Sequence, residues 1–242
     1  MHILKNHERA LGMGRDGHVE SNRRATQKLR RYSVAALLFN AILILIAMPA
    51  LAKTPEILAL GDSLTAGLGL PASEAFPARL QARLKSEGVD VKIVNAGVSG
   101  DTTTDGLARL DWALADKPDY VILAFGANDM LRGIDPKIVR ANLDKMIEKI
   151  QASGAKILLL GMRSSPDWGP QYEREFDAIY PNLAKAHDVP LYPFFLEGVA
   201  MNPALNQPDG LHPNQRGVAL MVDHIAPLVA KLVSAPPAES KS

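Results

Sequence analysis

The sequence predicts an α/β protein, in which helices cover both faces of a five-stranded parallel sheet. Short apolar runs alternate along the chain with longer segments whose apolar residues recur every three or four positions, as in amphipathic helices. Several of the apolar runs stop abruptly at a glycine, which is typical of buried strands that reach the carboxyl edge of a parallel sheet. No internal repeat or linker interrupts this alternation, so we expect one domain.

The composition suits a globular protein with a sizeable core, since 47% of the 242 residues are hydrophobic. The absence of cysteine excludes disulfides, thiolate zinc sites and cysteine nucleophiles. Residues 1–52 hold eight of the 27 basic residues but only three of the 26 acidic ones, so the rest of the chain carries a charge of −4. A mildly acidic body in a chain with 5% aromatic residues argues against a nucleic-acid partner.

The first 52 residues have the pattern of a secretory signal peptide. Arg30 and Arg31 precede a fifteen-residue apolar segment at 34–48, and Pro-Ala-Leu-Ala follows at 49–52. The alternative is a permanent membrane anchor, but a bilayer span takes about 20 apolar residues and the proline ends the segment sooner. We therefore expect a leader and signal peptide at 1–52, with translation starting at Met1 or later, and a single domain at 53–242. The mature protein would be periplasmic or secreted, without a stable membrane anchor.

The first strand and the first helix follow this leader. Four apolar residues at 57–60 end at Gly61 and predict a strand. A helix is predicted at 76–86, because Phe76, Leu80 and Leu84 share one face while basic residues lie opposite, and a glycine follows.

The middle of the chain repeats this alternation twice. A second strand is predicted at 91–95 and a helix at 104–115, where leucines recur along one face. The wholly apolar run 120–125 predicts the third strand, and the periodic segment 138–152 predicts the next helix.

The last third completes the sheet. A fourth strand is predicted at 156–161, followed by a polar loop at 163–170 and a helix from 171 to about 187. A short fifth strand at 189–192 belongs at the sheet edge, and a final helix runs over 215–233. The loop with Ser164, Pro166 and Trp168 either lines a substrate pocket or is an ordinary surface connection.

Polar side chains gather at the strand ends. The first strand ends in Gly-Asp-Ser at 61–63, the second in Asn-Ala-Gly at 95–97 and the third in Gly-Ala-Asn-Asp at 126–129. Because parallel strands end at one edge of the sheet, we expect these segments to lie close together, where ligands collect in such folds. A further polar loop, Asp-Gly-Leu-His-Pro-Asn at 209–214, precedes the last helix.

These loops contain the groups that serine-based acyl transfer needs: a hydroxyl, a base, a group that orients the base, and donors for an oxyanion. Ser63 would attack, His212 would take and return its proton, and Asp209 would hold the imidazole in the correct tautomer. The oxyanion hole would combine the backbone N–H groups of Ser63 and Gly97 with the side-chain amide of Asn128.

Each of these residues also has a structural interpretation. Asp62 or Ser63 could simply cap the following helix, and His212 could be an ordinary surface histidine. We expect Asp62 to support its loop through backbone hydrogen bonds, and Asp129 to act as a cap. The other histidines of the body, His187 and His224, lie in helical patterns and are interpreted as structural.

Four blocks, in order, resemble those of the SGNH (GDSL) hydrolase superfamily: Gly61-Asp62-Ser63-Leu64, Gly97, Gly126-Ala127-Asn128-Asp129 and Asp209-Gly210-Leu211-His212-Pro213. The resemblance covers nearly all of residues 56–232. It extends to 95–102 and 176–181, and it is strongest to a subgroup of periplasmic thioesterases, lysophospholipases and arylesterases. Close relatives often have a second glycine where this chain has Ala127, which could alter loop mobility or substrate fit.

The resemblance implies a flavodoxin-like, three-layer α/β/α fold with strand order 2-1-3-4-5 and no metal or organic cofactor. It carries over Ser63, Gly97, Asn128, Asp209 and His212 as site residues. The implied activity is that of a serine esterase or thioesterase acting through an acyl-enzyme on aryl esters, acyl-CoA thioesters or lysophospholipids.

Two other functions remain open at the level of the sequence. A carbohydrate O-deacetylase would use the same machinery, whereas a non-catalytic lipid- or carbohydrate-binding module would not need an oriented base. The phosphate-loop ending Gly-Lys-Ser/Thr and the Gly-x-Gly-x-x-Gly spacing are both absent around 61–69, which argues against nucleotide binding. No feature of the sequence indicates an oligomeric state, and the expected partner is a small-molecule or lipid acyl ester.

Overall fold

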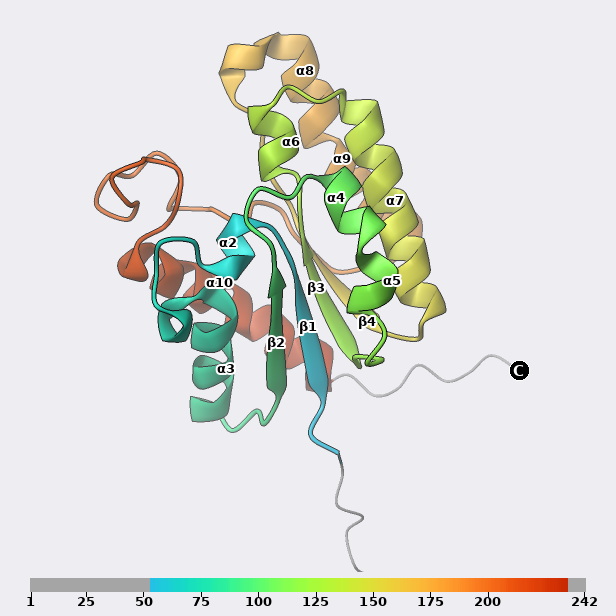
Figure 1. Cartoon of the computed structure of the whole chain (residues 1–242), viewed down its shortest axis with the longest axis vertical. Coiled ribbons are helices and arrows are strands. Elements are labelled where there is room, and N and C mark those ends of the chain that lie inside the picture. Colours follow the sequence, from blue (N-terminus) through green and yellow to red (C-terminus); the bar gives the residue numbers. More distant parts are fainter. Residues whose placement is uncertain (1–52, 235–242) are drawn as a thin grey trace, which may run out of the picture. The chain divides into compact units, whose positions relative to one another are not determined.

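The computed structural model describes residues 53–234 (Figure 1), and the predicted signal peptide lies outside this range. The described residues contain a five-stranded sheet of order β2-β1-β3-β4-β5, in which every neighbouring pair is parallel. This confirms the predicted fold class and strand order. The strands are β1 (Glu56–Gly61), β2 (Lys92–Gly97), β3 (Tyr120–Ala124), β4 (Lys156–Leu160) and β5 (Leu191–Tyr192).

Helices connect these strands. They are α2 (Ser63–Ala66), α3 (Phe76–Ser86), α4 (Thr103–Ala108), α5 (Leu110–Ala113), α6 (Ala127–Leu131), α7 (Pro136–Ala152), α8 (Gly169–Asp177), α9 (Ile179–His187) and α10 (Gln215–Ser234). Two 3-10 turns, η1 (Ala72–Glu74) and η2 (Pro166–Trp168), lie in the connections before α3 and α8.

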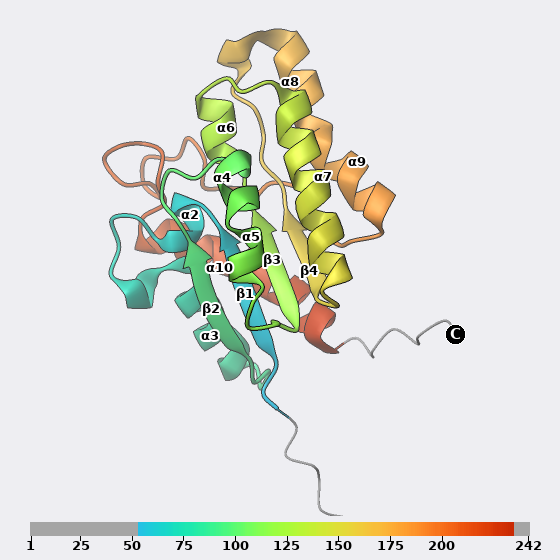
Figure 2. The same ribbon diagram turned by 45° about the vertical axis from the view of Figure 1, so that its right-hand side comes forward.

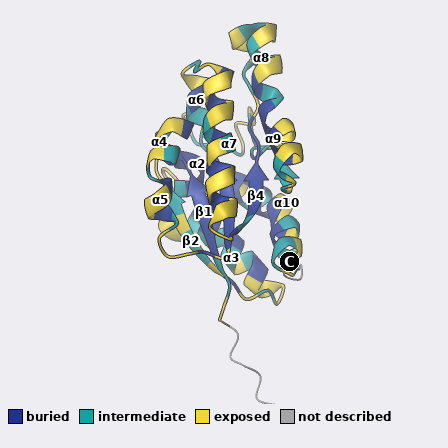
Figure 3. Ribbon diagram, turned by 90° about the vertical axis from the view of Figure 1, so that its right-hand side faces the viewer, coloured by how far each residue is buried: buried dark blue, intermediate teal, exposed yellow. Residues whose placement is uncertain are grey.

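The helices form a layer on each side of the sheet. Figures 1 and 2 show α3 and α10 together on one face and α4, α5 and α7 on the other, where α9 also packs against α7. Helix α10 is long and apolar enough to cross a membrane by composition, but its inward side chains are buried in the core. Figure 3 shows the buried residues concentrated in the sheet and on the inner sides of the helices, as expected for this architecture.

Burial along the strands matches their order. Every residue of β3 is buried, and so is all of β1 after its first residue, whereas β2 at one edge has exposed positions. The two-residue strand β5 forms the other edge, as predicted. The segments that follow β1 and β3 therefore begin at the ends of buried strands in the centre of the sheet.

Three helices differ from the prediction in ways that local chemistry explains. Helix α7 begins two residues earlier than the apolar pattern indicated, because the Asp135 side chain accepts a hydrogen bond from the N–H of Lys137 and Pro136 fits the first turn. The helix predicted over 171–187 is divided at Ala178. Pro181 lacks the N–H that would bond four residues back, which favours a break just before it.

The helix predicted over 104–115 is also divided. Arg109 lies between α4 and α5 with φ −100° and ψ 2°, outside regular helical geometry. Its side chain turns toward the carboxyl edge of the sheet, where it takes part in the site described next.

Candidate active site

Ser63 is held in the first turn of α2, directly after β1. The Asp62 side chain caps this helix by accepting a hydrogen bond from the N–H of Leu64 at 3.0 Å. Asp62 thus supports the loop through the backbone, as predicted. A capping role for Asp62 is compatible with the predicted role of Ser63, because the cap fixes the turn that presents the Ser63 hydroxyl.

His212 lies against Ser63 although the two are 149 residues apart in the chain. The Nε2 atom of His212 is 2.9 Å from Ser63 Oγ, and its Nδ1 atom is 2.7 Å from Asp209 Oδ2. The structure thus brings together the three residues predicted as nucleophile, base and orienting acid. With the Nδ1 proton donated to the carboxylate, Nε2 is left free to accept the hydroxyl proton.

Asp209 is well suited to remain ionised. Its Oδ1 atom accepts hydrogen bonds from the N–H groups of Leu211 at 2.9 Å and of His212 at 3.0 Å. The backbone hydrogen bond from His212, followed by the bond to its ring, lowers the pKa of Asp209 to about 2. A carboxylate that stays charged near neutral pH can stabilise an imidazolium forming beside it.

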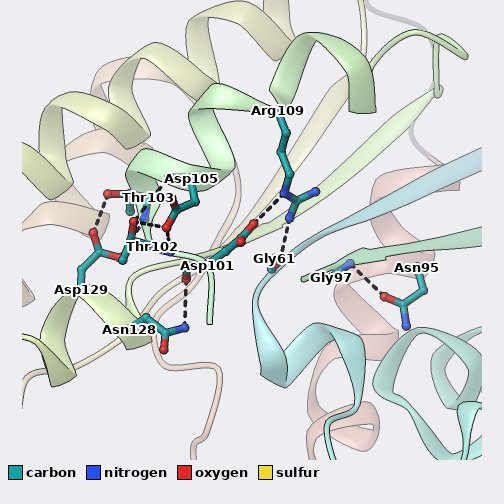
Figure 4. A network of polar contacts seen from close by, with 10 residues as sticks. All are labelled: Gly61, Asn95, Gly97, Asp101, Thr102, Thr103, Asp105, Arg109, Asn128 and Asp129. Atoms are coloured by element: carbon teal, nitrogen blue, oxygen red, sulfur yellow. Dashed lines mark hydrogen bonds and ion pairs between the residues drawn. The ribbon is translucent and has the colours of Figure 1, made fainter. Parts of the chain in front are cut away.

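Asn128 lies at the carboxyl edge of the sheet, at the start of α6. Its Nδ2 atom donates to the backbone oxygen of Asp101 at 2.9 Å, so the amide is directed toward the loop that follows β2 (Figure 4).

Gly97 has a different environment from the one predicted. Its N–H donates to Asn95 Oδ1 at 3.0 Å (Figure 4), while the next residue, Val98, donates its N–H to Gly61 on the neighbouring strand. Because successive N–H groups of a strand point in opposite directions, the Gly97 N–H faces away from β1. A Cβ at Gly97 would lie 2.3 Å from the nitrogen of Ala66, so this glycine lets β2 and α2 approach closely.

Gly100 is a second glycine of the same loop, three residues further on. It has φ +90°, and within residues 53–234 its N–H has no hydrogen-bond acceptor. Its carbonyl accepts from Arg132 Nη2 at 2.8 Å, and the next residue, Asp101, is the one that Asn128 contacts. The sequence carries both glycines, and spacing alone did not indicate which of them has a free amide beside Asn128.

Arg109 contacts residues at or just beyond the ends of three strands, which the sequence did not reveal; Figure 4 shows its bonds to Asp101 and Gly61. Its Nε atom is 2.7 Å from Asp101 Oδ2, and its Nη2 atom donates to the carbonyl of Gly61 at 3.0 Å. The guanidinium carbon lies 5.8 Å from the ring centroid of Phe125, directly after β3. In the sequence this arginine lies within the helix predicted over 104–115 and is not one of the leucines that define its apolar face.

Asp129 is a cap, but not of its own helix. It is fully buried in the first turn of α6, and its carboxylate accepts from the N–H of Thr103 at 2.9 Å and from the Thr103 hydroxyl at 2.6 Å. Thr103 is the first residue of α4, so Asp129 ties the two helices together. Burial raises the pKa of Asp129.

Asp62 is also fully buried, and burial raises its pKa to about 7. Only one of its two carboxyl oxygens has a hydrogen-bond partner, since Oδ2 is buried without one. With a pKa of about 7, Asp62 holds its proton in an appreciable fraction of the molecules near neutral pH.

The loop at 163–170 packs on the segment that follows α6. Trp168 lies against Gly133, where a Cβ would be 2.6 Å from its ring, and its ring centroid is 5.8 Å from that of Tyr172. Its suggested part in a substrate pocket stays a prediction. Across residues 53–234, no three His, Asp or Glu side chains are grouped so that they could hold a metal ion.

Comparison with known proteins places these residues in a family context. Residues 59–220 match the model of the GDSL-like lipase/acylhydrolase family. The chain is 41% identical over 199 residues to esterase TesA of Pseudomonas aeruginosa, an alignment that covers 82% of this chain and 99% of the relative.

Two further proteins are similar over most of their length. The thioesterase 1/protease 1/lysophospholipase L1 of Escherichia coli is 40% identical over 184 residues, which cover 76% of this chain and 87% of that protein. The crystal structure of AlinE4, an SGNH-hydrolase family esterase, aligns with a TM-score of 0.64 and 47% identity over 77% of this chain and 100% of that one.

Proposed function

This chain belongs to the GDSL-like lipase/acylhydrolase family and is an ester-hydrolysing enzyme, and on that premise we propose that Ser63, His212 and Asp209 form its catalytic triad. The observation that carries the proposal is the pair of contacts made by one imidazole, 2.9 Å to the Ser63 hydroxyl and 2.7 Å to the Asp209 carboxylate. A histidine held between a hydroxyl and an ionised carboxylate is the arrangement that serine acyl transfer requires.

The triad would act in two steps. Ser63 Oγ attacks the carbonyl carbon of the ester while its proton passes to His212 Nε2, and His212 then returns that proton to the departing alcohol or thiol. A water molecule next attacks the acyl-enzyme, again giving its proton to His212, and the carboxylic acid leaves as Ser63 recovers its proton. Asp209 stays charged throughout, since its pKa of about 2 keeps it ionised.

We propose that the oxyanion is stabilised by the N–H groups of Ser63 and Gly100 and by the amide of Asn128. Gly100 takes the place of Gly97 in this proposal because its N–H is free among the described residues, whereas that of Gly97 is bonded to Asn95. A crystal structure of the enzyme with a phosphonate covalently bound to Ser63 tests this proposal. A true oxyanion donor would lie about 2.7–3.1 Å from the phosphonate oxygen that takes the place of the oxyanion. An oxygen bound by Gly97 instead would restore the original prediction.

The proposed substrates are aryl esters, acyl-CoA thioesters and lysophospholipids. Support comes from relatives whose names include esterase, thioesterase and lysophospholipase, together with similarity over nearly the whole described domain. A hydrolysis panel of p-nitrophenyl esters of increasing length, acyl-CoAs, lysophospholipids and acetylated sugars tests this range. Preference for the acetylated sugars would favour the deacetylase alternative.

The decisive experiment compares wild type with Ser63→Ala on a p-nitrophenyl ester. The variant should lose turnover and labelling by a fluorophosphonate, because the attacking oxygen is missing, while its melting temperature stays close to that of wild type. Near-normal turnover by folded Ser63→Ala would contradict the proposal. In the same assay Asn128→Ala should lower kcat by roughly 10²–10³, the usual loss for one oxyanion donor.

We also propose, from the sequence of residues 1–52, that the enzyme is exported and cut after Ala52. Amino-terminal sequencing of protein recovered from the periplasm or the medium should then begin at Lys53. Membrane-bound protein that retains residues 1–52 would instead indicate a permanent anchor.

A further inference from the structure

The Ser63–His212 contact joins the start of α2 to a loop near the other end of the domain's sequence. Residues 201–213, here termed the histidine loop, carry both Asp209 and His212. On one side this loop borders a cavity of about 400 Å³, lined by Met201, Pro203, Asn206, Gln207, Pro208 and Gly210. All six of these residues belong to the histidine loop itself, so its placement against Ser63 depends on the contacts that the loop makes with the rest of the domain.

Gln207 supplies such a contact from within the histidine loop. Its backbone N–H donates to the carbonyl of His212 at 2.7 Å. Its side-chain Nε2 donates to the carbonyl of Leu68 at 2.7 Å and to that of Pro213 at 3.0 Å. Gln207 is thus hydrogen-bonded to the backbone of His212 through its own backbone, and to Leu68 in the segment after Ser63 through its side-chain amide.

The bond to Leu68 leads directly back to the nucleophile. The N–H of Leu68 donates to the carbonyl of Ser63 at 3.2 Å, closing the carboxyl end of α2. The Ser63 and His212 backbones are therefore linked through two residues: Leu68 donates to Ser63 and accepts from the Gln207 side chain, and the Gln207 backbone N–H donates to His212. This link spans the same two residues whose side chains lie 2.9 Å apart.

The segment after α2 is shaped to receive this amide. Gly69 has φ +79°, and a Cβ at that position would lie 2.1 Å from Gln207 Oε1. Any larger residue at position 69 would collide with the amide, so the Gln207 side chain rests directly on the Gly69 backbone.

We propose that Gln207 is a positioning residue, which holds the histidine loop against the Ser63 segment and so sets the distance between base and nucleophile. The inference rests on the proposed function, because it concerns the geometry of that same triad. Gln207 does not touch the reacting atoms in this arrangement, and its effect on the rate passes through the placement of His212.

The test uses Gln207→Met, which keeps the length of the side chain but removes the N–H donor, and Gln207→Ala, which removes both. The matched control is Gln151→Ala, which deletes another side-chain amide that donates to a backbone carbonyl, that of His187 at 2.9 Å, remote from the triad. Each protein is assayed for kcat, KM, the rate of fluorophosphonate labelling and melting temperature.

Both Gln207 variants should lose roughly 10- to 100-fold in kcat and in labelling rate, with KM nearly unchanged, since a misplaced base slows acylation without removing substrate contacts. Gln151→Ala should keep wild-type rates. Wild-type kcat in folded Gln207→Met, or an equal loss of rate in Gln151→Ala, would overturn the inference.

A second variant keeps the inference testable if Gln207→Met fails to fold. Gly69→Ala should displace the amide and lower the labelling rate in the wild-type background. It should have a smaller effect when combined with Gln207→Ala, because the colliding group is then absent. Equal effects in both backgrounds would overturn the proposed contact.

Failure of this inference differs from failure of the proposed function. An inactive Ser63→Ala with fully active Gln207 variants would leave the triad intact and remove only the positioning role. An active Ser63→Ala would remove both.

Discussion

Asp62, next to Ser63, stabilises the local backbone but also places a carboxyl group in a buried position. Its Oδ1 atom caps α2, while Oδ2 is buried without a partner and burial raises the pKa to about 7. Asp129 and Asp101 raise this pKa further, whereas the hydrogen bond from Leu64 and the charge of His212 lower it. The free energy of unfolding should therefore vary with pH in a way that depends on the ionisation of Asp62.

We predict that Asp62→Asn becomes more stable relative to wild type as the pH rises from about 4 to about 7. In that range the folded wild type holds a proton that the unfolded chain, with an ordinary pKa of 3.8, has already released. Wild-type stability therefore falls as the pH rises, by at most about 1.4 kcal/mol per pH unit, while a neutral asparagine has no such dependence.

Melting temperatures of both proteins between pH 4.5 and pH 8 check this prediction. The difference between the two melting temperatures should shift in favour of Asp62→Asn up to about pH 7 and level off above it, where folded wild type has also lost the proton. A constant difference would mean that Asp62 ionises in the folded protein as freely as in the unfolded chain.

The residues that sequence reasoning found and those that it missed differ in a physical way. Ser63, Asp209 and His212, which the structure brings together, each lie within two residues of a glycine in a polar segment that borders a predicted strand or helix. Arg109 and Gln207 act through contacts to backbone carbonyls distant in the chain, and nothing in their local pattern separates them from solvated residues. Gly97 and Gly100 look alike in sequence, and only the direction of each N–H distinguishes them.

Among the secondary-structure elements, α4 links the site to the core. Its first residue is bonded to Asp129, and Gly106 in its second turn faces the ring of Phe125. That ring in turn lies beneath the Arg109 guanidinium. Close packing of α4 on the end of β3 thus supports the network that holds the strand ends together.

We predict that Gly106→Ala destabilises the protein, although alanine is the better helix former by about 1 kcal/mol. A Cβ at Gly106 would lie 2.5 Å from Phe125 Cζ and 2.7 Å from Cε1, so the buried ring must move. Overpacking of this kind typically costs about 1–3 kcal/mol, which exceeds the gain in helix propensity. Urea unfolding gives the sign directly, and a stabilised variant would show that α4 shifts away without cost.

The helix boundaries illustrate the limits of periodicity at this scale. Apolar spacing predicted α3 over the residues it occupies, because nothing within that segment interrupts the pattern. It missed the division at Arg109, where leucines continue on both sides of the break while the backbone leaves the helical region. Periodicity records which face is buried, whereas a break depends on contacts that individual side chains make elsewhere.

On the scale of the whole molecule, the parallel sheet was predictable because its strands are buried and their apolar runs are bounded by turn residues. The strand order followed from the family resemblance rather than from any property of the strands, and the structure confirms it. Ser63 lies directly after β1, and His212 lies in the loop before α10. Segments near the two ends of the domain's sequence therefore meet at the carboxyl edge of the sheet.

The wide separation of Ser63 and His212 along the chain has a consequence for the newly made polypeptide. Neither a nascent chain nor one that crosses a membrane unfolded can place the His212 imidazole beside Ser63, since the two are 149 positions apart and the chain between them must first fold. If Ser63 and His212 act together as proposed, the enzyme therefore becomes active only when folding is essentially complete.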